Sequence, residues 1–159
     1  MLRVFIIEDE APARERLAAL IESDPAAAAE FNAHLADVTR YLLTQKNCDL
    51  VPLAEEMAFL RSYVRLMELR FPRSLRVMLP GVDPADPRRL PPASLQLLIE
   101  NALKHNRLSA AEPLAIEVRL EAASLVIAHP LRPKHALPAG TGTGLANLRE
   151  RIALLTPGQ

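Results

Sequence analysis

Residues 97–106 read Leu-Leu-Ile-Glu-Asn-Ala-Leu-Lys-His-Asn and combine an apolar helical pattern with several polar side chains. Residues three and four apart are neighbours on a helix, so Asn101, Lys104 and His105 are expected on one face. An amide oxygen that can bind Mg²⁺ and a nearby cation are two parts of an ATP site. A polar helix end is the other interpretation, because the helix dipole favours cations there.

A second stretch carries three of the chain's five glycines, Gly140, Gly142 and Gly144, and runs directly into a helical pattern over residues 145–152. Glycines let the backbone approach an anion closely, and a helix N-terminus offers unpaired N–H groups to phosphate. A glycine-rich turn before a helix is more often only a turn. Together with residues 97–106, however, this stretch indicates a nucleotide site.

The composition is that of an ordinary globular protein. The 159 residues are 50% hydrophobic and 24% charged, and their formal net charge is zero. This balance disfavours a general surface for nucleic acid or an anionic membrane. The single cysteine, Cys48, excludes an internal disulfide framework and fits a reducing cytosol. No apolar run is long enough to cross a bilayer, so a cytoplasmic location without membrane contact is expected.

Hydrophobic periodicity predicts two long helices, over residues 25–45 and 52–71. Their apolar residues repeat alternately every four and three positions, as in the seam of a helical hairpin or bundle. The seam residues are Phe31, Leu35, Val38 and Leu42, then Leu53, Met57, Leu60, Val64, Met67 and Phe71. Both helices packing within their own domain remains an alternative. A seam shared with a second copy of the chain is favoured, and a homodimer is therefore expected.

Strands and helices alternate after residue 72. Strands are predicted over residues 75–79, 114–121 and 124–128, helices over 93–106 and 144–155, and a proline-rich loop over 80–92. This order predicts helices on one face of an antiparallel or mixed sheet. The fold class is therefore α+β, with a helical hairpin at 25–71 and a small α/β sandwich at 72–159. Residues 1–24 are expected to form a strand over 2–7, an acidic turn and a helix over 12–22.

Six segments resemble, in order and spacing, the sensor histidine kinases of the LytS type. The ATP-binding half of these proteins belongs to the gyrase/Hsp90/histidine-kinase/MutL superfamily. Residues 99–106 look like that family's N-box, and residues 140–151 look like its G2 box. The other matching segments are Leu35-Ala-Asp-Val-Thr-Arg-Tyr-Leu42, Val51-Pro-Leu-Ala-Glu-Glu56, Leu69-Arg-Phe71 and Leu90-Pro-Pro-Ala-Ser-Leu-Gln-Leu98.

The resemblance implies roles for the polar residues of the N-box-like segment. Asn101 would be the Mg²⁺-binding amide, and Glu100 a carboxylate that polarises or orders a water. Lys104 would lie near the nucleotide phosphates, and His105 would line the site. Metal and positive charge at the phosphates are what phosphoryl transfer requires of a protein.

The resemblance also implies roles for residues nearer the C-terminus. Gly140, Gly142 and Gly144 would form the hinge and floor beneath the triphosphate, and Asn147 would steady that loop. His129 stands at a strand end where relatives tend to carry an asparagine. It would contact the nucleotide base or merely end the strand. The chain stops at Gln159, just after the G2-like helix, so the sandwich is expected to lack its last strands.

The implied function is that of the ATP-binding module of a two-component kinase. It would transfer a phosphoryl group from Mg-ATP to a histidine, and then to a response regulator receiver domain. The family's acceptor motif, Asn-Pro-His-Phe, is not found before the first hairpin helix. His34, the only histidine of the hairpin, is interpreted as a neutral surface or bundle residue. The alternative function is a catalytically inactive dimerisation or regulatory fragment of a two-component system.

Residues 1–17 resemble the opening of a LytR/AlgR-type response-regulator receiver. The resemblance covers a strand, the acidic turn Glu8-Asp9-Glu10 and the start of a helix. No later strand ends in a phospho-accepting aspartate, so the acidic residues are interpreted as solvated charges. A receiver-like regulator is accordingly the least favoured of the three functions.

Overall fold

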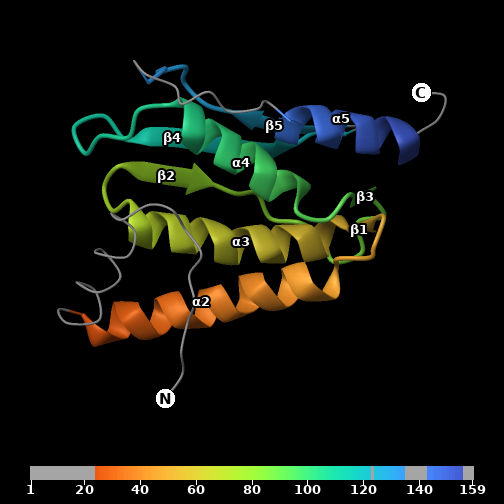
Figure 1. The fold of residues 1–159 in the computed structure, drawn as a ribbon, viewed down its shortest axis with the longest axis horizontal. Helices are drawn as coiled ribbons and strands as arrows, with labels where there is room; N and C mark the ends of the chain where they lie inside the picture. Colours follow the sequence, from red (N-terminus) through yellow and green to blue (C-terminus); the bar gives the residue numbers. More distant parts are fainter. Residues whose placement is uncertain (1–23, 123, 135–142, 156–159) are drawn as a thin grey trace.

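The computed structural model describes residues 24–122, 124–134 and 143–155, and it places a helical hairpin beside a small mixed sheet (Figure 1). The hairpin consists of α2 (Pro25–Thr44) and α3 (Leu53–Arg70), and two further helices follow, α4 (Ser94–His105) and α5 (Thr143–Leu155). The expected fold class is confirmed. The strand predicted over residues 2–7 and the helix over 12–22 lie outside the described residues.

Local signals explain where α2 begins. The carboxylate of Asp24 accepts a hydrogen bond from the Ala27 N–H (3.0 Å), and Pro25 occupies the first turn, where no N–H is needed. Near this end, Arg65 of α3 donates two hydrogen bonds to the carboxylate of Glu30, at 2.6 and 3.1 Å. His34 lies one turn further, with Nε2 3.8 Å from the same carboxylate. Its interpretation as a neutral bundle histidine stays a prediction.

The main sheet has the order β2-β4-β5, formed by β2 (Leu75–Met78), β4 (Leu114–Leu120) and β5 (Leu125–Ala128). β2 and β4 are parallel, with Leu75 opposite Leu114, and α4 lies in the connection between them. β4 and β5 pair antiparallel. The sheet is therefore mixed, one of the two forms that the order of elements predicts.

A second, two-stranded sheet joins β1 (Val51–Pro52) to β3 (Arg89–Leu90) in antiparallel fashion. The sequence predicts only a loop over residues 80–92, and this part of the expectation is wrong. Two residues are too few to show the alternation of apolar and polar side chains that identifies a strand. The small sheet holds the start of α3 against the segment that leads into α4.

One hydrophobic core runs through the hairpin and the main sheet. It joins Leu60 of α3 and Ile99 of α4 to Ile116 of β4, all three with exposed fractions of 0%. Within it α3 forms the middle layer, with α2 on one side and β2 and α4 on the other (Figure 1). The domain boundary expected after residue 71 stays a prediction, but core residues from both sides of it pack together.

The apolar seam of α3 packs within its own chain. Leu53, Met57, Leu60 and Val64 are buried, and Met67 and Phe71 pack against the same core. The chain's own helices and sheet therefore bury four of these six residues and partly bury the other two. A homodimer stays a prediction. The seam of α2 is less fully covered, since its residue Leu42 is 43% exposed and the neighbouring Leu43 is 71% exposed.

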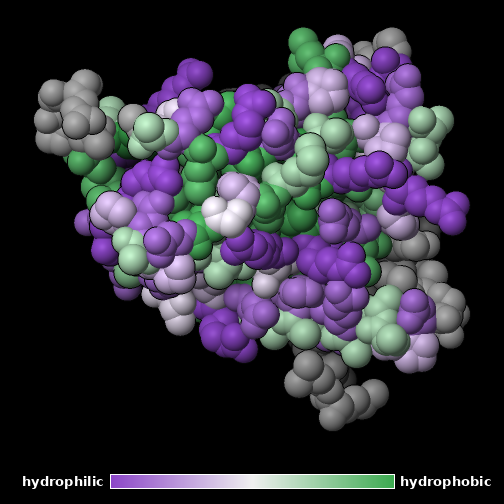
Figure 2. Space-filling view, turned by 180° about the vertical axis from the view of Figure 1, so that it is seen from behind, coloured by the Kyte–Doolittle hydropathy of each residue, from purple (hydrophilic) through white to green (hydrophobic). Residues whose placement is uncertain are grey.

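The two faces of the main sheet differ. β4 buries Leu114, Ile116 and Val118 against the core, whereas Ala115 and Arg119 on its other face are exposed. Next to them Met78 of β2 is 56% exposed. Figure 2 shows the molecule from behind, with a group of apolar side chains in the upper middle bordered by hydrophilic ones. The described residues therefore cover one face of the sheet more completely than the other.

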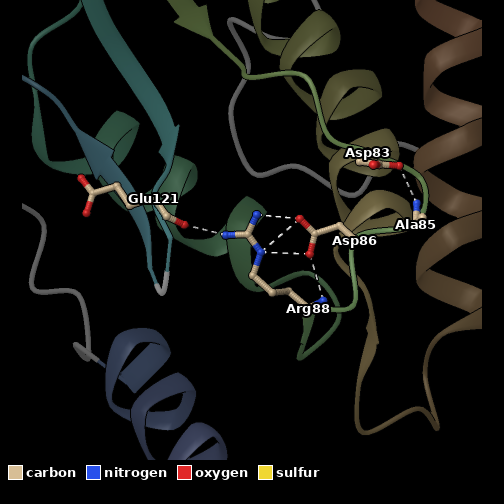
Figure 3. A network of polar contacts seen from close by, with 5 residues as sticks. All are labelled: Asp83, Ala85, Asp86, Arg88 and Glu121. Atoms are coloured by element: carbon tan, nitrogen blue, oxygen red, sulfur yellow. Dashed lines mark hydrogen bonds and ion pairs between the residues drawn. The ribbon is translucent and has the colours of Figure 1, made fainter.

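A network around Arg88 fixes the loop between β2 and β3 (Figure 3). The Arg88 guanidinium donates to both carboxylate oxygens of Asp86, at 2.6 to 3.1 Å, and its Nη1 donates to the Glu121 carbonyl (2.8 Å). Asp86 also accepts the Arg88 backbone N–H (2.9 Å). The loop is thereby tied to the end of β4.

We expect the Asp86 carboxyl to titrate far below its ordinary range. Hydrogen bonds from the Arg88 side chain and backbone lower the pKa of Asp86 from 3.8 to about 2. Because the native pKa is lowered, the network stabilises the folded state above pH 3.8, and this contribution is lost as the pH falls toward about 2. An NMR titration of the Asp86 carboxyl carbon measures the midpoint. Arg88→Leu should raise this midpoint toward the ordinary value of 3.8. A midpoint near 3.8 in the unmodified protein would contradict the prediction.

Candidate functional site

α4 is amphipathic, with one apolar face and one polar face. Its buried residues Leu95, Ile99, Ala102 and Leu103 face the core, as expected from their helical spacing. Asn101, Lys104 and His105 lie on the opposite side, where Lys104 is exposed and the other two are half-buried. The structure therefore gathers these three predicted site residues on one outward side of the helix.

A hollow of about 380 Å³ lies between the first half of α4 and α5. It brings two predicted site residues together, Glu100 of α4 and Asn147 of α5, whereas Asn101, Lys104 and His105 are not among the residues that line it. The lining residues are Pro92, Ala93, Ser94, Gln96, Leu97, Glu100, Asn147, Leu148 and Arg151.

The glycine stretch is only partly described. Gly144 stands in the first turn of α5, which begins at Thr143. Gly140 and Gly142 lie outside the described residues, and their predicted contact with phosphate stays a prediction. Further along α5, Arg151 Nη2 donates to the Cys48 carbonyl (2.8 Å). This bond attaches α5 to the turn that joins α2 to β1.

The start of α4 lacks a capping side chain of its own. Ala93, the residue before the helix, has a left-handed backbone with φ of 61°. Pro91 and Pro92 precede it and offer no N–H groups. The carboxylate of Glu56, from α3, takes over the capping. Its Oε2 accepts the Ala93 N–H (2.9 Å) and its Oε1 accepts the Leu95 N–H (3.0 Å).

Glu56 is fully buried, with an exposed fraction of 0%. The Tyr41 hydroxyl of α2 donates to its Oε2 at 2.5 Å, and the Tyr41 ring stacks on Phe59 with centroids 4.1 Å apart. Burial raises the pKa of the Glu56 carboxyl above its usual range, against the opposing effect of the hydroxyl and N–H donors. Burial and the hydrogen bond to Glu56 also raise the pKa of Tyr41. One carboxylate thus connects α2, α3 and α4.

The sequence contains a signal for the burial of Glu56. Glu56 lies three residues after the seam residue Leu53 and four before Leu60, so it stands on the apolar side of α3. A carboxylate at such a position must be paired or hydrogen-bonded when the helix is buried. Its partners, 15 to 39 residues away along the chain, could not be identified from spacing.

Asn106, just after α4, is a second buried polar residue, with an exposed fraction of 0%. Its Nδ2 donates to the Ala102 carbonyl (2.8 Å), and its Oδ1 accepts the Arg132 N–H (2.6 Å). His129, a predicted contact of the nucleotide base, is exposed at the end of β5, with Nδ1 3.4 Å from Asn106 Nδ2. Asn106 therefore joins the end of α4 to the segment that follows β5.

The donor chemistry of the outward side of α4 fits a magnesium nucleotide. The amide oxygen of Asn101 is the kind of hard ligand that Mg²⁺ accepts, and the Lys104 ammonium suits phosphate. Magnesium keeps several waters and phosphate oxygens as ligands, so it does not require a protein cage. In the described residues no three histidine, cysteine or acidic side chains gather as metal ligands. Among the same residues, no helix has the length and apolarity to span a membrane.

Comparison with known proteins finds histidine kinases as relatives. Residues 15–75 match the family model described as histidine kinase. The sensor protein kinase HptS of Staphylococcus aureus is 30% identical over 130 residues, which are 82% of this chain and 23% of that protein. The resemblance to sensor histidine kinases is confirmed.

An uncharacterized sensor-like histidine kinase of Staphylococcus epidermidis is 29% identical over 127 residues, which cover 80% of this chain and 23% of that protein. The chain thus spans about a quarter of the length of these curated histidine kinases. The family match begins at residue 15. No finding supports the receiver-like resemblance of residues 1–17, which stays a prediction.

Proposed function

We propose that this chain is the ATP-binding part of a two-component sensor histidine kinase. The observation that carries the proposal is the outward side of α4, where Asn101, Lys104 and His105 lie together, in a chain similar to sensor histidine kinases. Such proteins act in two-component signalling, so we propose a response regulator receiver domain as the onward partner. A second copy of the chain is the other partner that we propose.

Bound Mg-ATP would supply the phosphoryl group. The Asn101 amide oxygen would ligate magnesium, and Lys104 would place positive charge beside the phosphates. Glu100, at the border of the hollow, would order a water, and His105 would line the site. The first turn of α5, with Gly144, would offer backbone N–H groups to the triphosphate. Asn147 would steady this end of the site from the second turn.

We expect Mg²⁺-dependent binding of ATP that Asn101→Ala weakens at least about ten-fold, which corresponds to about 1.4 kcal/mol. The variant removes the one amide oxygen proposed to contact the metal. Isothermal titration calorimetry with and without Mg²⁺ measures the effect. Asn32→Ala is the matched control, since Asn32 is an exposed amide on α2, outside the proposed site. Equal affinity of the wild type and Asn101→Ala would contradict the proposed role.

A catalytically inactive dimerisation or regulatory fragment is the second candidate function. The observation in its favour is that Asn101, Lys104 and His105 do not line the hollow between α4 and α5. In that case, no binding of Mg-ATP is expected at millimolar concentration. Incubation with radiolabelled ATP and a separate acceptor domain of the histidine kinase family distinguishes the two functions. Labelled acceptor supports the kinase module, and absence of label together with a lack of ATP binding supports a regulatory fragment.

A further inference from the structure

Four of the N–H groups at the start of an α-helix have no partner within the helix, and a buried helix start must satisfy them from elsewhere. At the start of α4 this is done by a residue of another helix. The N–H groups of Ala93 and Leu95 both donate to the carboxylate of Glu56, which belongs to α3 and not to the helix that it caps. Its negative charge also complements the positive end of the α4 dipole.

The same carboxylate is held by α2. Tyr41 donates to Glu56 Oε2, the oxygen that also accepts the Ala93 N–H. A displacement of α2 that withdrew the Tyr41 hydroxyl would leave a buried carboxylate with fewer donors. A buried carboxylate that lacks hydrogen-bond donors destabilises the fold, so the Glu56 side chain would reorient or take up a proton. Either response changes what the first turn of α4 is bonded to.

The backbone at this point depends on external support. Ala93 adopts a left-handed conformation, which is unfavourable for a residue with a side chain. A left-handed alanine persists only where the surroundings fix it. The hydrogen bond from its own N–H to Glu56 is such a restraint. The direction in which α4 leaves the loop therefore depends on the Glu56 carboxylate.

We infer that Glu56 is a positioning residue through which α2 sets the placement of α4, the helix that carries Asn101 and Lys104. The inference rests on the proposed function for its link to nucleotide. A second contact supports the inference, because Arg151 of α5 donates a hydrogen bond to the Cys48 carbonyl in the turn after α2. Both helices that flank the proposed nucleotide are thus attached to the same end of the hairpin. Movement of the hairpin would reach the nucleotide site through these two contacts.

The first test measures hydrogen exchange of individual backbone amides by NMR in the nucleotide-free protein. Tyr41→Phe removes the hydroxyl but keeps the stacked ring, and Glu56→Gln keeps one acceptor oxygen but removes the charge. Both variants should accelerate exchange of the Ala93 and Leu95 amides by about five- to ten-fold, as expected for a weakened hydrogen bond. Amides of β4 should change much less. Glu55→Gln, which alters the neighbouring exposed carboxylate, is the matched control and should leave the two amides unchanged.

Two outcomes would overturn the inference. Unchanged exchange at Ala93 and Leu95 in both variants would show that Glu56 does not hold the start of α4. Equal acceleration across α4 and β4 would show a general loss of stability instead of a local one. Both variants keep the size of the side chain, so they are expected to fold. Circular dichroism verifies this.

The second test measures binding of Mg-ATP to the same variants. Glu56→Gln and Tyr41→Phe should weaken binding by about three- to ten-fold, whereas Glu55→Gln should bind like the wild type. If wild-type protein binds no Mg-ATP, the proposed function fails, while the exchange data still decide whether Glu56 positions α4. If the amides respond but ATP affinity is unchanged, the link from α2 to nucleotide is overturned although the proposed function stands.

Discussion

Replacing Leu60 with alanine is expected to lower the free energy of unfolding by about 2–5 kcal/mol, the range for truncating a buried leucine. Leu60 has an exposed fraction of 0% and belongs to the core shared by α3, α4 and β4. The truncation removes apolar contacts and leaves a cavity between the hairpin and the sheet. Urea unfolding followed by far-ultraviolet circular dichroism measures the change. Leu43→Ala is the matched control, since Leu43 is 71% exposed on α2, and its effect should stay within about 0.5 kcal/mol.

The same experiment tests whether the hairpin and the sheet form one cooperative unit. The core is continuous across residue 71, so helical and strand signals should be lost in one transition, and Leu60→Ala should shift both together. Two transitions, of which the variant shifts only one, would contradict this expectation. They would instead support the domain boundary that the sequence predicts after residue 71.

Replacing the buried Asn106 with alanine should cost about 1–3 kcal/mol, because it leaves the part-buried Arg132 N–H without an acceptor. The side chain also loses its bond to the Ala102 carbonyl. Asn106→Asp separates the two contributions: it keeps an oxygen for the Arg132 N–H but places a carboxylate against that carbonyl. We expect Asn106→Asp to be at least as destabilising as Asn106→Ala. Thermal or urea unfolding measures both.

Asn32→Ala is again the control, since Asn32 is exposed on α2. A change in stability for Asn106→Ala no larger than for this control would contradict the prediction. NMR spectra of the segment 129–134 should change in Asn106→Ala and not in Asn32→Ala, because only Asn106 is bonded to that segment.

Helices and long strands could be predicted from the sequence, because their apolar residues repeat with a clear period. α2, α3, α4, β4 and α5 each lie within one or two residues of the expected bounds. The pair β1 and β3 could not, since two residues show no period. The sequence predicted either an antiparallel or a mixed sheet and could not decide between them, because strand direction depends on how α4 crosses between β2 and β4.

The apolar seam shows why burial cannot be assigned to a partner from periodicity. A narrow apolar stripe indicates that a helix is covered, but it does not say by which surface. In α3 the chain's own sheet and helices cover it.

Candidate site residues on one helix, such as Asn101 and Lys104, could be placed together by spacing alone. Glu56 and its contact with Ala93 could not, since the two residues are 37 positions apart.

The parallel pairing of β2 with β4 has a consequence for the order in which the molecule assembles. β2 ends at Met78 and β4 begins at Leu114, so the pair can form only after the chain of residues 79–113 has closed on itself. Closing such a long connection costs entropy before any strand contact compensates for it. The α2–α3 hairpin needs only the short turn over residues 45–52. We therefore expect the hairpin to form early in folding and α3 to offer the apolar surface on which the sheet later condenses.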